Sequence, residues 1–268
     1  MTKEQRFMVD VGIKNIPFPL KVASRENEGG ILTVGRISVN AHIMQEFEAT
    51  WIDIFIQNLH QHRQIIGTKT LKNNIGVYCR EFGNAPVRID FQYPLFIEKT
   101  TPVTHEKCLV QYSCSYSVKA TPGQESKILF KIDVPVITTF PKTSLFTMDR
   151  LFGQLSVVTV EVKSEADVYP EDLVDIVDKH ALVPVYSYLT PEDQDYVIHK
   201  IHKANKTSVV MVEEIKEELA HSKNIEWYSV HCANFGMLHS YSTYIGTEKS
   251  NWAPFGEYSA ELDRESGL

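Results

Sequence analysis

The chain has 268 residues, of which 43% are apolar and 23% are charged, a composition typical of a globular protein with a full-sized core. Its net charge is −7 and its basic residues are mixed with acidic ones, so we expect no nucleic-acid partner, because phosphate binding needs clustered positive charge. We find no secretory signal pattern, no apolar run long enough to span a membrane and no C-x-x-C pair, and we expect a cytoplasmic protein without membrane contact.

The first part of the chain predicts one strand and one helix. Residues 30–40 alternate apolar and polar side chains, which is typical of a half-buried strand. Apolar residues recur at helical spacing from Phe47 to Leu59, which predicts an amphipathic helix over residues 46–62. Residues 69–74 are polar, and we expect them to form a loop.

The middle of the chain predicts a set of antiparallel strands. Alternating patterns cover residues 87–97, 107–119 and 126–138. A Pro-Gly pair at residues 122–123 marks the turn between the last two of these segments. Residues 155–162 predict a further strand.

The second half is more helical. Pro170 followed by two acidic residues is a strong helix start, and Thr190 before a proline predicts an N-cap. A third helix is expected from the apolar stripe that begins at Val209. Two short strands are expected at residues 227–230 and 239–245.

These elements predict an α+β fold. We expect a single domain over residues 1–250, and the alternative is a pair of fused modules over about 1–140 and 141–250. Residues 251–268 are rich in Ser, Glu, Asp and Gly, and we expect a flexible tail there.

Residues 134–160 carry the most specific pattern in the chain. They contain Val-Pro-Val, then Phe140-Pro-Lys, then Phe152-Gly-Gln-Leu-Ser. This pattern resembles the signature region of the type IB GTP cyclohydrolases, which has Val-Pro-Val, Cys-Pro-Cys-Ser and Gly-Ala-His-Asn-Gln-Arg-Ser at the same spacing. Further matches extend over roughly residues 10–245. The resemblance implies the tunnelling fold (T-fold), in which antiparallel sheets with paired helices associate into oligomeric barrels. It also implies a small-molecule substrate and a homo-oligomer, a dimer or tetramer, with sites at subunit interfaces.

The sequence departs from the family pattern at the expected active site. The resemblance puts Phe140 and Phe152 at the positions of a zinc-binding Cys and His, and Lys142 at a second Cys. Val209 stands where the family has a guanine-binding Glu, and Trp51 where it has a His. Because a catalytic zinc needs three protein ligands, we expect a diverged member that lacks the zinc-ligand Cys and His, with no metal and no cofactor.

The family's third zinc ligand, a Glu, falls near Glu192, Asp193 and Gln194. His239 keeps a catalytic-type position and is the expected general acid or base, with Lys142 as its charged partner. The expected substrate-binding residues are Trp51, Phe140, Phe152, Val209, His231 and Tyr241.

Three functions follow as hypotheses. The leading one is a metal-independent biosynthetic enzyme that acts on an aromatic or heterocyclic small molecule by cyclisation, hydrolysis, dehydration or isomerisation. The second is a non-catalytic small-molecule-binding or scaffold protein, in which Phe140 and Phe152 only fill the volume of a lost metal site. The third is a genuine GTP cyclohydrolase that converts GTP to 7,8-dihydroneopterin triphosphate with displaced metal ligands.

Overall fold

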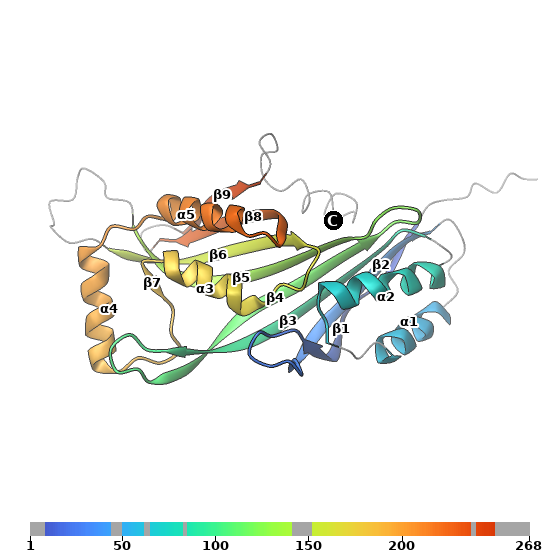
Figure 1. The fold of residues 1–268 in the computed structure, drawn as a ribbon, viewed down its shortest axis with the longest axis horizontal. Helices are drawn as coiled ribbons and strands as arrows, with labels where there is room; N and C mark the ends of the chain where they lie inside the picture. The colour runs from blue at the N-terminus through green and yellow to red at the C-terminus, as the bar shows by residue number, and fades with distance from the viewer. Residues whose placement is uncertain are drawn as a thin grey trace, which may run out of the picture.

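The computed structural model of the chain describes residues 9–43, 50–61, 65–82, 85–140, 152–236 and 240–249. Within these ranges the fold is α+β, with one antiparallel sheet and helices packed against it (Figure 1). The strands are β1 (Val9–Val22), β2 (Ile31–Ile43), β3 (Val87–Thr100), β4 (Lys107–Ala120), β5 (Lys127–Thr139), β6 (Gly153–Ser164), β7 (Val183–Pro184), β8 (Ile225–Phe235) and β9 (Thr243–Glu248). The helices are α1 (Thr50–Gln61), α2 (Thr68–Glu81), α3 (Pro170–His180), α4 (Pro191–Lys203) and α5 (Ser208–His221).

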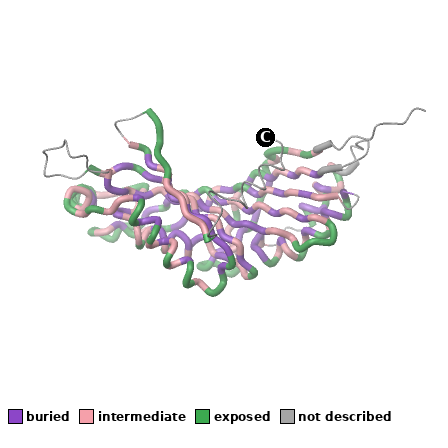
Figure 2. Tube along the Cα trace, turned by 90° about the horizontal axis from the view of Figure 1, so that it is seen from above, coloured by how far each residue is buried: buried purple, intermediate pink, exposed green. Residues whose placement is uncertain are grey.

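The sheet has the strand order β1-β2-β3-β4-β5-β6-β8-β9, and the short β7 pairs with β5. Burial alternates along the strands, as period-two side-chain geometry requires, and Figure 2 shows buried and less buried residues alternating along the trace. On β8, Val230 and Cys232 are fully buried and belong to the same core as Ile215 of α5. The intervening His231 therefore points to the opposite face of the sheet.

Apolar stripes on the helices form the other half of the core. On α2, Leu71 and Ile75 are buried, and on α5 the corresponding stripe is Met211, Ile215 and Leu219. Burial of one such side chain stabilises the fold by about 1.5–3 kcal/mol. This packing, together with the sheet, places the start of α5 over the ends of β5, β6 and β8.

The two halves of the chain repeat one order of elements. The first half runs β1, β2, α1, α2, β3, β4, and the second runs β5, β6, α3, α5, β8, β9 with β7 and α4 inserted after α3. An equivalent main-chain hydrogen bond in each half joins the end of its first strand to the segment just before its last helix. The Ala23 N–H donates to Ile66 O at 3.0 Å, and the Thr139 N–H donates to Lys206 O at 2.8 Å. Ala23 therefore corresponds to Thr139.

The structure confirms the α+β class and most of the expected elements, and it corrects one segment. The predicted loop at residues 69–74 is wrong, because these residues lie in α2, where Leu71, Ile75 and Tyr78 are buried at helical spacing. The long edge strand β1 was not predicted. No helix among the described residues is long and apolar enough to cross a membrane.

Candidate functional site

A buried network of uncharged polar side chains lies where β5, β6 and β8 meet the start of α5. Thr138 pairs with Gln154 across β5 and β6, and Ser156 pairs with Asn234 across β6 and β8. These four side chains and Ser208, the first residue of α5, are all buried. Buried polar groups must be hydrogen-bonded, so their geometry is tightly set.

Asn234 is the centre of this network. Its Oδ1 accepts a hydrogen bond from Ser156 Oγ at 2.8 Å, and its Nδ2 donates to Ser208 Oγ at 3.0 Å. The Ser156 and Thr138 hydroxyls lie 2.8 Å apart, and Gln154 Nε2 donates to Thr138 Oγ1 at 3.2 Å. The chain of bonds therefore joins three strand ends to the first turn of α5.

Two of the predicted aromatic residues flank this network. The Phe140 N–H donates to Phe152 O at 2.7 Å, so the backbones of the two residues are paired directly. The Phe140 ring lies against Gly236, where an added Cβ would stand 3.2 Å from Phe140 Cε2. Phe152 is 40% exposed, which leaves an aromatic side chain at the surface of this corner.

Val209 completes the group that the structure brings together. It follows Ser208 at the start of α5 and is largely exposed. Phe140, Phe152 and Val209 thus lie at one corner, beside the network centred on Asn234. We call this group of residues the β5–α5 corner.

His231 lies on the other face of the sheet. Its Nε2 lies 2.6 Å from Ser229 Oγ, while its buried Nδ1 has no hydrogen-bond partner among the described residues. Burial, and then the charge of Lys131, lowers the pKa of His231, which favours the neutral ring. A Cβ at Gly246 would lie 2.2 Å from His231 Nδ1, so glycine is what admits the ring.

The remaining predicted residues are not placed at the corner. Trp51 is the second residue of α1, which lies at the opposite end of the molecule from α5 and from the C-terminal end of β5 (Figure 1). Tyr241 precedes β9 and is largely exposed. Lys142 and His239 lie outside the described residues.

Asp193 is fully buried and serves as an anchor for a loop and a helix. Its Oδ1 accepts from the Val103 and Thr104 N–H groups at 2.8 and 3.1 Å, and its Oδ2 accepts from Thr104 Oγ1 at 2.6 Å and from Thr190 Oγ1 at 2.8 Å. Burial raises the pKa of Asp193, but the hydrogen bonds, led by that of Thr104, outweigh it and lower the pKa well below its usual range. Both carboxylate oxygens are thus occupied, in a capping box at the start of α4.

The side chains described at the β5–α5 corner do not fit a zinc ion. They offer hydroxyls, amides and the Cys232 thiol, whose pKa is raised to about 11, chiefly by burial, so that the thiol is protonated. Zinc binds deprotonated thiolates, neutral imidazoles and carboxylates. Over the described ranges no three His, Cys, Asp or Glu residues are grouped to hold a metal. The uncharged groups of this corner can orient a flat ligand. Proton transfer needs a titratable side chain from another part of the protein.

Sequence comparison finds a family over nearly the whole chain. A model described as type I GTP cyclohydrolase folE2 matches residues 3–245. The chain is 29% identical over 240 residues to the GTP cyclohydrolase FolE2 of Geobacter sp. (strain M21), covering 90% of this chain and 89% of that protein. It is 30% identical over 239 residues to the GTP cyclohydrolase FolE2 of Geotalea uraniireducens (strain Rf4), covering 89% of this chain and 87% of that protein.

Structure comparison finds a shared fold at low sequence identity. A urate oxidase of Bacillus sp. TB-90 superposes with a TM-score of 0.56 at 8% identity, covering 91% of this chain and 100% of that chain. A uricase from Arthrobacter globiformis gives 0.55 at 11% identity, covering 96% of this chain and 100% of that chain. At such identities the likeness concerns the fold alone.

These matches correct the prediction of a diverged member that lacks its zinc ligands. The folE2 model covers residues 3–245, and the FolE2 proteins align over about nine-tenths of the chain. The family match itself thus gives no evidence that this chain has lost its metal ligands.

Proposed function

Because the chain belongs to the type I GTP cyclohydrolase folE2 family, we propose that it is a GTP cyclohydrolase, which converts GTP to 7,8-dihydroneopterin triphosphate. The match to this family over residues 3–245 is the observation that carries the proposal. It favours the third hypothesis, a genuine GTP cyclohydrolase, over the leading hypothesis of a repurposed metal-independent enzyme and over a role as a scaffold.

The β5–α5 corner supports a role in holding the purine ring. Phe140 and Phe152 provide aromatic surface at the end of a rigid network, and Val209 adds an apolar contact from α5. Aromatic rings stack well on flat heterocycles, with a gain of about 0.5–1.5 kcal/mol beyond burial. The network around Asn234 fixes the strands that carry these residues, so the purine would meet a preorganised wall.

Hydrolytic opening of the five-membered ring of GTP and release of formate need proton transfers between water, the ring nitrogens and the protein. We assign these transfers to His239, with Lys142 as the charged group that stabilises developing negative charge. The uncharged corner itself provides no such group.

We further propose that a second copy of the chain completes the site in a T-fold barrel of two or four chains. The repeat in the fold supports this. Ser24 follows Ala23 as Phe140 follows Thr139, and in the first half Ser24 Oγ bonds Glu171, the second residue of α3. Trp51 is the second residue of α1, the helix that corresponds to α3. A neighbouring copy that packed as the two halves do would bring the start of α1 to Phe140.

The test of the activity is a GTP assay with the full chain, purified without chelator and with its metal content measured. We expect GTP consumption with release of formate. His239→Gln should lower kcat by about 100-fold or more at an unchanged melting temperature, as loss of an acid–base group does. The control His199→Gln changes an exposed residue of α4 and should leave kcat within about twofold. Absence of GTP consumption at every metal loading would refute the proposal.

The shared site has its own test, which mixes two inactive variants. Trp51→Ala and His239→Gln remove residues that we place in the same site from different copies. After subunit exchange of an equal mixture, about a quarter of the wild-type activity should return, because half of the dimers are mixed and each mixed dimer holds one intact site. No recovery, with exchange shown by mass spectrometry, would contradict a site shared between copies.

A further inference from the structure

The chain between Asp195 and Glu213 is basic in a protein that is acidic as a whole. The net charge of the protein is −7, yet this stretch has no acidic residue and contains Lys200, Lys203 and Lys206. It covers most of α4, the connection to α5 and the start of α5. Clustered positive charge attracts phosphate and other anionic groups, so this stretch is a candidate site for an anion.

The connection between α4 and α5 is fixed to the end of β5. Thr139 Oγ1 donates to Ala204 O at 3.2 Å and accepts from the Lys206 N–H at 2.7 Å. α4 also packs on β6, because a Cβ added at Gly153 would lie 2.9 Å from Ile201 Cγ2. Figure 1 shows α4 at this end of the sheet, leading into α5. The two phenylalanines of the β5–α5 corner follow Thr139 and precede Gly153, so the basic stretch borders the corner.

Lys200 and Lys203 are open to a ligand, whereas Lys206 is not. Lys206 forms an ion pair with Glu214 of α5. Lys200 and Lys203 form no ion pair within the part of the chain that the structure describes, and Lys203 is exposed while Lys200 is half-buried. They are three residues apart in α4, so their side chains leave the same side of the helix. Two positive charges therefore stand together beside the corner.

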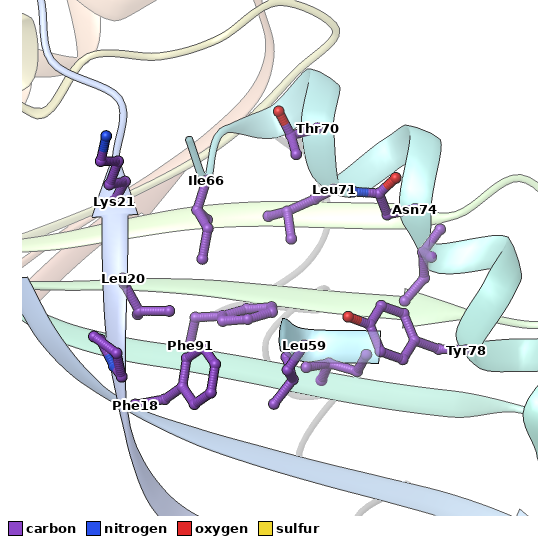
Figure 3. Close-up of a pocket in the computed structure, with 13 residues that line it drawn as sticks. Phe18, Leu20, Lys21, Leu59, Ile66, Thr70, Leu71, Asn74, Tyr78 and Phe91 are labelled. Carbon is purple, nitrogen blue, oxygen red and sulfur yellow. The ribbon is translucent and has the colours of Figure 1, made fainter. Parts of the chain in front are cut away.

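A hollow beside α2, in the first half of the chain, is no alternative place for a nucleotide (Figure 3). Its cavity volume is about 30 Å³, which has room for one or two water molecules. Its walls are mainly apolar, and Lys21 is the only charged residue among those that line it. The hollow therefore fits neither the size of a base nor the charge of its phosphates.

We propose that Lys200 and Lys203 bind the polyphosphate of a nucleoside triphosphate whose base lies at the β5–α5 corner. This subsite rests on the proposed function and adds to it the group that holds the triphosphate. The side chains described at the corner are uncharged, so they suit the base and do not balance the negative charges of the phosphates. Lysine ammonium groups bind phosphates as point charges and need no exact geometry. Base and phosphates would then contact two adjacent surfaces of one end of the molecule.

Two exposed lysines provide a matched pair of variants for steady-state kinetics. Lys203 lies beside the corner, and Lys223 follows the far end of α5. Lys203→Glu should raise KM for GTP by about 10-fold or more and leave kcat within about threefold, because the phosphates are bound alike before and during the reaction. Lys223→Glu makes the same charge change and should leave KM within about twofold. Equal effects on KM would overturn the proposal.

The positive charge of Lys200 and Lys203 could instead serve only the end of α4, since cations in a last turn complement the helix dipole. Lys200→Gln separates the two roles. A phosphate-binding Lys200 predicts that KM for GTP rises by about 3- to 10-fold. A lower melting temperature with an unchanged KM would show the helix role alone and would overturn the proposal.

Inorganic tripolyphosphate tests the subsite without any turnover. Calorimetry with the full chain and no GTP should show saturable binding, weakened about 10-fold or more by Lys203→Glu and unchanged by Lys223→Glu. Guanosine, which has no phosphates, should inhibit the wild type and Lys203→Glu equally. Equal tripolyphosphate binding by the two variants, or none by the wild type, would overturn the subsite. A wild type that consumes no GTP but shows the expected difference with tripolyphosphate would refute the proposed activity and support the subsite.

Discussion

The network at the β5–α5 corner predicts that Asn234 is a major determinant of stability. Asn234→Leu keeps a similar volume and removes the hydrogen bonds to Ser156 and Ser208 at 2.8 and 3.0 Å. A buried hydroxyl left without its partner costs about 1–3 kcal/mol. The Ser156 hydroxyl keeps its hydrogen bond with the Thr138 hydroxyl at 2.8 Å, so the cost of losing its bond to Asn234 lies at the lower end of that range. We therefore expect a loss of about 2–4 kcal/mol in the free energy of unfolding.

Urea denaturation followed by circular dichroism measures this loss as a lower midpoint with an unchanged slope. Thr243→Val is the control, because Thr243 is exposed and its hydroxyl lies 3.5 Å from Asn234 Nδ2, so the loss should stay below about 0.5 kcal/mol. The double variant with Ser208→Ala should cost less than the sum of the two single changes, since both remove the same bond. A loss below about 1 kcal/mol for Asn234→Leu, or strict additivity with Ser208→Ala, would refute the reasoning.

Three further predictions concern other parts of the molecule. The hydrogen bond from Lys179 is the largest cause of the lowered pKa of Glu218. This interaction therefore stabilises the fold at pH values above the pKa of Glu218 in the unfolded chain, and the stabilisation is lost as the pH falls through the pKa of Glu218 in the folded protein. Glu218→Gln should therefore flatten the acid limb of a stability–pH curve, by less than about 1 kcal/mol because the pair is partly exposed. Asp193→Asn should speed amide exchange in the loop that it anchors, measured by mass spectrometry, and unchanged exchange would count against that role. Gly246→Ala should lower the melting temperature because its Cβ would meet His231, and the added change His231→Ala should restore it; failure to restore would show another cause.

The strands of the middle segment could be predicted from the sequence because their alternation is regular. Residues 107–119 and 126–138 match β4 and β5 within a residue or two at each end, and one face of each is buried. The helix start at Thr190 could also be predicted from the sequence, since Thr190 and Asp193 form the capping box that such a sequence favours.

Two elements were missed for physical reasons. The start of α2 has polar outer positions, and only the buried spacing of Leu71 and Ile75 marks it as a helix. β1 contains Pro17 and Pro19, which argue against a central strand and are tolerated on an edge. Whether a segment with two prolines forms a strand depends on its position in the sheet, and that position is set by strands distant in the sequence.

The candidate site was predictable only in part. Phe140 and Phe152 belong to the signature pattern, and the structure places them near the start of α5, which carries Val209; that these residues bind the substrate stays a prediction. The central role of Asn234 was missed, because a single buried asparagine shows no periodic signal and acquires its partners only when four distant segments meet. The alternation of β8 could have shown that His231 faces away from Asn234.

The strand order also has a consequence for how the chain folds. From β3 to β6 every strand pairs with its neighbour in sequence, so this stretch can form by successive hairpins with no helix between the paired strands. The pairing of Ser164 with Ile225 must wait until α3, α4 and α5 have been bridged, and that of Ala41 with Val87 until α1 and α2 have been. The middle strands are thus the natural nucleus, and the β5–α5 corner is assembled late, when β8 closes onto β6.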